Sequence, residues 1–231
     1  MRFIRGLALV ALVALPATQA SAQRVGKFKF KAGSTVSGWG VSVGTYKGEL
    51  DGKALDIWCV DYLNHVGVGN KYNVYVTGLG IGSDVSKTRF GSLLGSDTYR
   101  KAVYLASKFS TSAHSDWKYI HAAIWSLTSP GIPNIVNASD VNKINAWLAT
   151  ATANYHHYYY NNAYVLSDVA ISRCAVASPG TAPWLGCGHQ EHIFIDGNLT
   201  ATPEPMTMGL LAVGLVGVAG VGAVRRRKKK Q

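Results

Sequence analysis

Two residues that lie far apart in the sequence could form a reactive pair. Cys59 lies in the segment Trp-Cys-Val-Asp, and His121 lies in the segment Tyr-Ile-His-Ala-Ala-Ile-Trp. An imidazolium beside a thiol lowers the pKa of the thiol and yields the thiolate, the nucleophile of cysteine enzymes. Asp61 and Asn64 are available to orient such a pair. The alternative is that Cys59 is an inert buried thiol and His121 a histidine at the edge of the core.

The same two segments resemble the thioester domains of bacterial surface adhesins, over about residues 40–150. In those domains a cysteine on an early strand is bonded to a glutamine that begins a Gln-x-Ala-Ile-Trp helix motif, and the thioester reacts with host amines. In this chain His121 stands where the motif glutamine belongs. An imidazole lacks the amide carbonyl from which the thioester is made. The resemblance therefore implies a shared architecture without the crosslinking chemistry.

A second histidine pair does not indicate a metal site. His189 and His192 are three residues apart and run into an expected strand. The helical zinc-protease motif needs a spacing of four, which places both imidazoles on one face. On a strand a spacing of three places them on opposite faces. We expect no metal and no other cofactor, and the glycine-rich segment 78–83 opens no helix that would indicate a nucleotide site.

An aromatic run offers a candidate binding surface. Tyr158, Tyr159 and Tyr160 are adjacent, and exposed tyrosines can stack on sugars or on partner proteins. The alternative is that the run ends a helix and packs on the sheet.

The two remaining cysteines are close in sequence. Cys174 and Cys187 are separated by a segment with two prolines and two glycines that lets the chain turn back. An exported protein can form disulfides, and the predicted pair is Cys174–Cys187. The sequence does not exclude Cys59 as a partner of either.

The N-terminus has the order of a secretory signal peptide. Arg2 and Arg5 precede an apolar run, and the small residues around Ala22 form a cleavage site before Gln23. We therefore predict a signal peptide over 1–22, removed by signal peptidase. An uncleaved N-terminal anchor is the alternative.

The C-terminus combines three features in order. Pro203-Glu204-Pro205 precedes the uncharged segment 206–224, which is followed at once by six cations, Arg225, Arg226, Arg227, Lys228, Lys229 and Lys230. Nineteen helical residues cover roughly 28 Å, close to the thickness of a bilayer core. The cations favour the cytoplasmic side, which leaves the body of the chain exported. We predict a transmembrane helix over 206–224 with a basic stop over 225–230.

This arrangement resembles the PEP-CTERM sorting signal of exported bacterial proteins. The resemblance covers about the last 30 residues, 203–231. It implies recognition by an exosortase, a membrane-embedded processing enzyme that cuts near the Pro-Glu-Pro motif and releases the body. A plain tail anchor that is never cut is the alternative.

The body between these ends, 23–202, is predicted to be one globular domain. The hydrophobic pattern alternates in strands and then changes to helical spacing before strands return. The expected helices are one over 97–109, one capped by Ser115 or Asp116 and one capped by Ser139. The expected strands lie over 27–31, 36–46, 55–62, 72–76, 164–176 and 192–196. This order predicts an α+β fold with a mainly antiparallel sheet or sandwich, about three inserted helices and the C-terminal transmembrane helix.

The charge of the chain is concentrated at its ends. The net charge is +11, but without the eight basic residues of the two termini the chain has 15 basic against 12 acidic residues. No basic stripe indicates nucleic-acid binding. We expect an inner-membrane-anchored precursor that becomes a cell-surface or extracellular-matrix protein. Its expected role is non-enzymatic, in structure, adhesion or a biofilm, and extracellular polysaccharide is a candidate partner. The alternatives are a cysteine-dependent enzyme or acyl-transfer module using Cys59 and His121, and a glycan-binding module.

Overall fold

The computed structural model describes residues 23–34, 36–129, 137–173 and 188–201. The predicted signal peptide with Ala22, the pair Cys174–Cys187 and the predicted sorting segment 203–231 lie outside these residues. Within the described residues, no helix is both long and apolar enough to cross a membrane.

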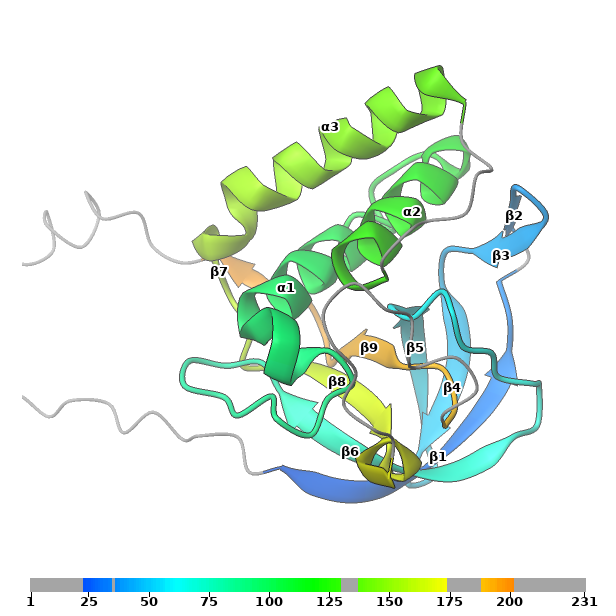
Figure 1. Ribbon diagram of the computed structural model, residues 1–231, viewed down its shortest axis with the longest axis vertical. Coiled ribbons are helices and arrows are strands. Elements are labelled where there is room, and N and C mark those ends of the chain that lie inside the picture. The colour runs from blue at the N-terminus through cyan, green and yellow to red at the C-terminus, as the bar shows by residue number, and fades with distance from the viewer. Residues whose placement is uncertain (1–22, 35, 130–136, 174–187, 202–231) are drawn as a thin grey trace, which may run out of the picture.

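Six antiparallel strands close into a barrel (Figure 1). The first strand, Arg24–Ala32, pairs along one edge with Tyr46–Leu50 and along its other edge with Lys71–Gly78. Neither edge of this strand is therefore free. The strands, in their order around the barrel, are β1 (Arg24–Ala32), β4 (Tyr46–Leu50), β5 (Lys53–Cys59), β9 (His192–Ile195), β8 (Ala163–Asp168) and β6 (Lys71–Gly78). Two small ribbons flank the barrel: β2 (Val36–Gly38) with β3 (Val41–Val43), and β7 (Tyr158–Tyr159) with β10 (Thr200–Ala201).

Alternation along the strands decides which side chains fill the barrel. In β1, Phe28 and Phe30 are buried while the lysines between and around them face solvent. Successive side chains of a strand point to opposite faces, so an apolar–polar alternation makes one face the core. The β4–β5 hairpin turns through Asp51 and Gly52, which both have positive φ, the conformation that a tight Asp-Gly turn requires.

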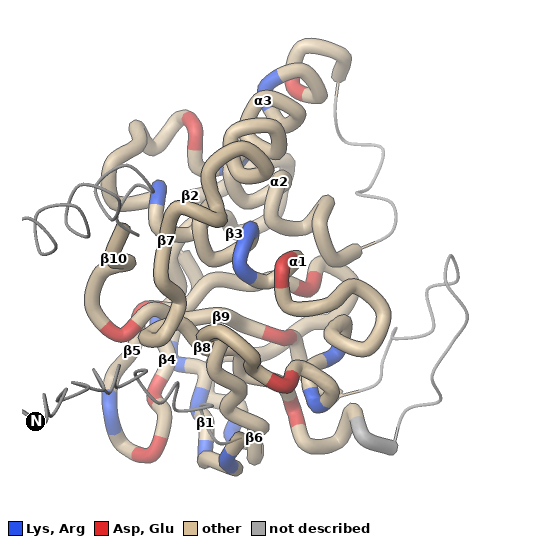
Figure 2. Tube along the Cα trace, turned by 90° about the vertical axis from the view of Figure 1, so that its left-hand side faces the viewer, with Lys and Arg blue, Asp and Glu red and all other residues tan. Residues whose placement is uncertain are grey.

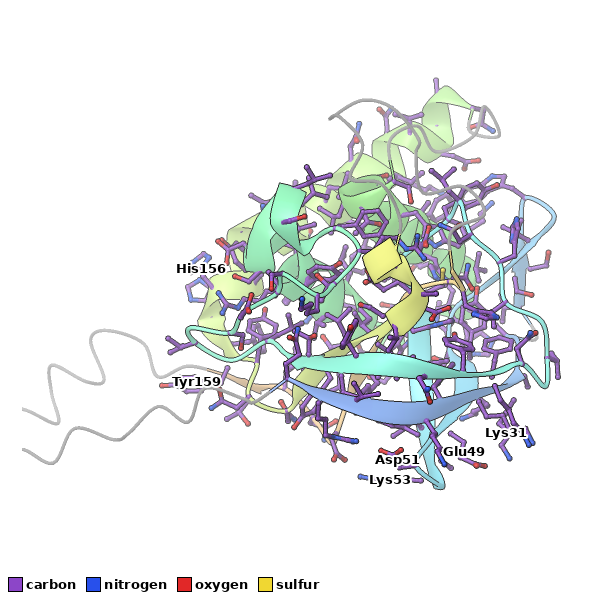
Figure 3. All side chains as sticks on the ribbon, turned by 60° about the horizontal axis from the view of Figure 1, so that its bottom comes forward. Lys31, Glu49, Asp51, Lys53, His156 and Tyr159 are labelled. Atoms are coloured by element: carbon purple, nitrogen blue, oxygen red, sulfur yellow. The ribbon has the colours of Figure 1, made fainter. Side chains whose placement is uncertain are left out.

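The outer face of the barrel carries charges of both signs. Figure 2 shows basic and acidic residues interspersed along the strands, and Figure 3 shows Lys31, Glu49, Asp51 and Lys53 projecting away from the helices. Lys31 pairs with Glu49 at 2.5 Å, and Lys53 pairs with Asp196 at 2.9 Å. Such exposed pairs contribute little to stability, because water and salt screen them.

The helices lie together on one side of the barrel (Figure 1). They are α1 (Gly91–Ala106), α2 (Trp117–Thr128) and α3 (Ala138–Asn154), and short 3-10 turns cover His114–Asp116, Tyr155–His157 and Val169–Arg173. Helix α2 is buried along nearly its whole length because α1, α3 and the β2–β3 ribbon pack around it, and its His121 contacts β4 and β5 of the barrel. Helix α3 is the outermost. Its N-cap is Asn137, whose side chain accepts a hydrogen bond from the Asp140 amide at 2.9 Å, rather than the predicted Ser139.

The fold differs from the predicted class. The prediction of a mainly antiparallel sheet or sandwich is wrong, because the strands form a closed barrel. Closure depends on β1 pairing with β6 and β5 pairing with β9, contacts between distant segments that hydrophobic alternation does not encode. The transmembrane helix that belonged to the same prediction has no counterpart among the described helices, and segment 206–224 lies outside the described residues.

Candidate functional site

Cys59 and His121 lie side by side, but they meet through the backbone. The Nε2 atom of His121 is 3.0 Å from the carbonyl oxygen of Cys59, and its Nδ1 atom is 2.7 Å from the amide nitrogen of Gly44. An amide can only donate, so Nδ1 accepts and Nε2 carries the proton that it donates to the carbonyl. Both ring nitrogens of His121 are therefore engaged by main-chain groups, and the imidazole links the end of β5 to the turn before β4.

The electrostatics of the pair keep both groups uncharged. Burial lowers the pKa of His121 to about 3, so the imidazole is neutral at physiological pH. Burial also raises the pKa of the Cys59 thiol, and the nearby Asp61 carboxylate raises it further. The thiol donates to the Asp61 carbonyl oxygen at 3.1 Å. A thiolate–imidazolium pair needs the opposite charge states on both residues.

The two residues considered as orienting groups bind elsewhere. Asp61 Oδ2 accepts a hydrogen bond from the Asn64 side chain at 2.8 Å, and Asp61 Oδ1 accepts one from the Leu63 amide at 3.2 Å. The carboxylate thus folds the loop after β5 and is not a partner of the His121 ring.

Cys59 is expected to resist alkylation in the folded protein. Its side chain is fully buried and its pKa is raised, so the reactive thiolate is scarce and shielded. Treatment with iodoacetamide followed by peptide mapping should find Cys59 unmodified in native buffer and modified in concentrated urea. Rapid modification of Cys59 under native conditions would show an activated, accessible thiol instead.

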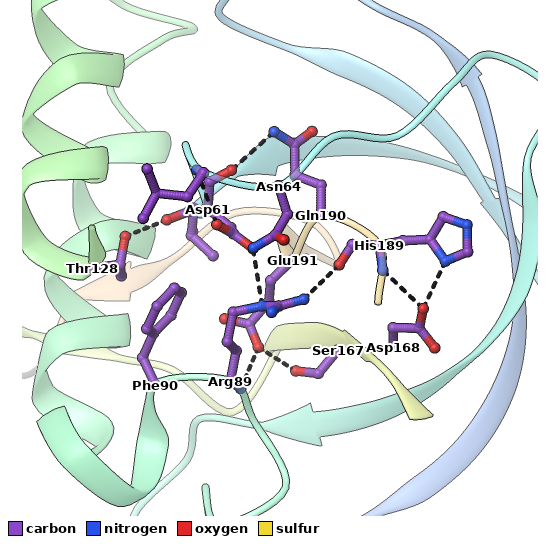
Figure 4. Close-up of polar contacts among 12 residues, drawn as sticks. Asp61, Asn64, Arg89, Phe90, Thr128, Ser167, Asp168, His189, Gln190 and Glu191 are labelled. Atoms are coloured by element: carbon purple, nitrogen blue, oxygen red, sulfur yellow. Dashed lines mark hydrogen bonds and ion pairs between the residues drawn. The ribbon is translucent and has the colours of Figure 1, made fainter. Parts of the chain in front are cut away.

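A buried ion cluster, formed by Asp61, Arg89 and Glu191, lies between the barrel and α1 (Figure 4). Arg89 Nε is 2.9 Å from Asp61 Oδ2, and both side chains are almost completely shielded from solvent. Glu191 Oε1 accepts the Arg89 backbone amide at 2.7 Å and also a short bond from Ser167, while Oε2 accepts the Tyr99 hydroxyl at 2.7 Å. Buried charges are tolerated when they are paired and hydrogen-bonded in this way.

The cluster joins three connections of the chain. Asp61 follows β5, Arg89 precedes α1, and Glu191 precedes β9. The Arg89 guanidinium also donates to the His189 carbonyl oxygen at 2.8 Å. Burial raises the pKa of Glu191 to about 7, although hydrogen bonds and Arg89 act in the opposite direction. Buried carboxyl groups with a shifted pKa occur both at functional sites and in structural ion networks. In this cluster each of the three side chains bonds to groups that connect elements of the fold, which is typical of a structural ion network.

His189 and His192 occupy different environments. His189 is half-buried, its Nδ1 lies 2.6 Å from Asp168 Oδ2, and its ring stacks on Tyr72 with centroids 4.0 Å apart. His192 is fully buried inside the barrel against Phe28 and Phe30, where burial lowers its pKa to about 3. No group of three or more His, Cys, Asp or Glu side chains within the described ranges could hold a metal ion.

The tyrosine run does not form one continuous surface. Tyr160 is buried and its hydroxyl donates to the Tyr155 carbonyl oxygen at 2.6 Å, and Tyr158 packs against Tyr104. Tyr159 is 39% exposed and projects outward, as Figure 3 shows. Tyr158 lies in strand β7 and contacts a tyrosine of helix α1, so the alternative of a helix end packed on the sheet does not describe it.

A cavity of about 330 Å³ lies at the mouth of the barrel, next to the β2–β3 ribbon and α2. Sequence reasoning missed it because its lining comes from five separate segments. We name it the mouth cavity, and its described lining residues are Phe30, Gly33, Val41, Ser42, Tyr46, Tyr62, His65, Val66, Val68, Trp125 and Gln190.

Comparison with protein-family models, with curated proteins and with solved structures found no match.

Proposed function

We propose that this chain is an exported protein that is sorted by its C-terminal segment and acts without catalysis at the cell surface or in the extracellular matrix. In this proposal it contributes structure or adhesion, as in a biofilm. The order of signal peptide, globular body, Pro-Glu-Pro motif, apolar segment 206–224 and basic end supports the route. Signal peptidase and an exosortase-like enzyme would process the two ends, with the precursor held in the inner membrane meanwhile.

One structural observation carries the non-catalytic part of the proposal. Both ring nitrogens of His121 are bound by backbone groups, so the imidazole is committed to holding Gly44 and Cys59 together. A general base needs a nitrogen that is free to take a proton. The Cys59–His121 pair therefore supports the role of a structural clamp better than that of a catalytic dyad.

The alternative function, a cysteine-dependent enzyme or acyl-transfer module, predicts a different result for substitution of Cys59. An enzyme or acyl-transfer module using Cys59 would lose its turnover completely in a Cys59→Ser variant that still folds. The proposed structural role predicts that the variant is exported and retained like the natural chain. Hydrolytic or acyl-transfer turnover that depends on Cys59 would overturn the proposal.

Processing of the chain is expected to leave defined ends. The full-length chain is expressed in a bacterial host with an exosortase and in the same host without it, and the intact mass of the product is measured. We expect a mature N-terminus at Gln23 in both hosts, with loss of the tail near Pro203-Glu204-Pro205 only when the exosortase is present.

The same experiment has a clear contrary outcome. Finding residues 1–231 untrimmed in the cytosol of both hosts would reject export and sorting together. A variant with Glu204→Ala serves as the matched control for the sorting motif, because it keeps the apolar segment and the basic end unchanged.

A further inference from the structure

The mouth cavity has walls made of aromatic side chains that are fixed in place. The Tyr62 ring meets the Trp125 ring edge to face with centroids 4.8 Å apart, and Phe30 lies against Tyr46 with centroids 6.0 Å apart. The Tyr46 hydroxyl donates to the Ser42 carbonyl oxygen at 2.6 Å. These contacts hold the rings before any ligand arrives, which reduces the entropic cost of binding.

The loop that carries Tyr62 is tied to the buried ion cluster. The Tyr62 amide donates to Ser129 Oγ at 3.2 Å, and the neighbouring Asp61 is paired with Arg89. The Gln190 side chain, which lines the cavity, donates to the Asp61 carbonyl oxygen at 2.9 Å. The cluster therefore positions two lining residues from opposite parts of the chain.

Among the lining residues that the structure describes, the polar groups include no carboxylate, ammonium or guanidinium. The described lining contains no Asp, Glu, Lys or Arg, although both signs of charge are common on the outside of the barrel. Ser42, His65 and Gln190 supply a hydroxyl, an imidazole and an amide. A charged ligand would find no carboxylate, ammonium or guanidinium among these residues. A purely apolar ligand would leave the hydrogen-bonding groups unused.

We propose that the mouth cavity binds one sugar ring of an uncharged polysaccharide. A sugar ring has an apolar C–H face that packs on an aromatic side chain and a rim of hydroxyls that exchange hydrogen bonds with neutral polar groups. The volume of about 330 Å³ lies at the lower end of ligand sites, which suits one ring of a longer chain that continues into solvent. The inference rests on the proposed function, which places the chain where extracellular polysaccharides are present.

The test measures binding of hexasaccharides to the full-length chain in mild detergent by calorimetry. The probes are the neutral cellohexaose, maltohexaose and mannohexaose, and the anionic probe is an alginate hexasaccharide. We expect at least one neutral probe to bind and the alginate probe not to bind. Failure of all three neutral probes, or a preference for alginate, would overturn the proposal.

Variants locate the site. Tyr62→Ala should weaken binding about tenfold because it removes the aromatic wall, while Tyr62→Phe should stay within about threefold of the natural chain. Val68 is 71% exposed at the rim, so Val68→Arg should narrow the entrance without unfolding the protein. Tyr159→Ala is the matched control outside the cavity and should bind as the natural chain does.

The outcomes separate this inference from the proposed function. If Tyr159→Ala abolishes binding while Tyr62→Ala and Val68→Arg retain it, the sugar is bound elsewhere and the mouth cavity is not its site. If the chain is exported and trimmed but binds no neutral probe, only the present inference fails. An untrimmed cytosolic chain would remove the proposed function first.

Discussion

Arg89→Met is expected to destabilise the folded protein by about 3–5 kcal/mol. The substitution removes the positive charge that lies 2.9 Å from Asp61 Oδ2 in an environment without solvent. Methionine fills part of the volume, but Asp61 is left as a buried carboxylate without its cation. Equilibrium unfolding in urea, followed by tryptophan fluorescence, measures the loss.

A surface pair provides the comparison. Lys47→Met breaks the surface ion pair between Lys47 and Asp56, whose side chains are 61% and 53% exposed, respectively. This substitution should lower the free energy of unfolding by less than about 1 kcal/mol. Adding Asp61→Asn to Arg89→Met should recover part of the loss, because the unpaired charge is then absent. If Arg89→Met costs no more than Lys47→Met, the cluster does not hold the three connections together.

His121→Asn is expected to weaken the dependence of stability on pH under acidic conditions. The pKa of His121 falls from 6.5 to about 3 on folding, so the unfolded chain binds more protons between these values. Stability therefore rises with pH across this window and is lost as the pH falls through it. A difference of one bound proton between the unfolded and folded states changes the free energy of unfolding by about 1.4 kcal/mol per pH unit. The slope of this free energy against pH should therefore be lower by about that amount in the variant between about pH 4 and 6.

Two other buried groups also affect how the free energy of unfolding depends on pH. His192 acts in the same direction, because its pKa is also lowered to about 3. Glu191 acts in the opposite direction. Its pKa is raised to about 7, so the folded state holds its proton more tightly and loses stability as the pH rises from about 4.5 to 7. The two histidines outweigh Glu191, and acid should unfold the protein.

The control for this prediction is an exposed histidine. His156 projects from the surface, as Figure 3 shows, and His156→Asn is the matched loss of a histidine outside the core. The free energy of unfolding is measured by urea titration at a series of pH values for the natural chain and both variants. Equal slopes for the natural chain and His121→Asn would mean that His121 is not held neutral by the fold.

Several elements followed from the sequence because their patterns are local. The alternation of lysine and phenylalanine predicted the strand at 27–31, which lies within β1. The helix expected to start after Ser115 or Asp116 is α2, which begins at Trp117. The helix expected over 97–109 matches only the second part of α1, which starts at Gly91, is interrupted where Gly95 adopts a φ of 72° and ends at Ala106.

The rest depended on contacts between distant segments. Glu191 was visible only as a member of a His-Gln-Glu-His segment, and no local pattern showed that it meets Arg89, 102 residues earlier, inside the protein. Barrel closure has the same origin, because alternation indicates which face of a strand is buried but not which edges pair. The proximity of Cys59 and His121 was inferred from motif resemblance, whereas their hydrogen bonding required the position of the Gly44 amide.

The protonation state of the His121 ring is the most direct test of the clamp on which the non-catalytic role rests. Nitrogen-15 NMR of histidine-labelled protein distinguishes the two neutral tautomers from the imidazolium. We expect the His121 ring, whose signals are assigned by their loss in His121→Asn, to keep its proton on Nε2 from about pH 7 to pH 5. A His121 ring that carries its proton on Nδ1, or that becomes an imidazolium within this range, would contradict the account.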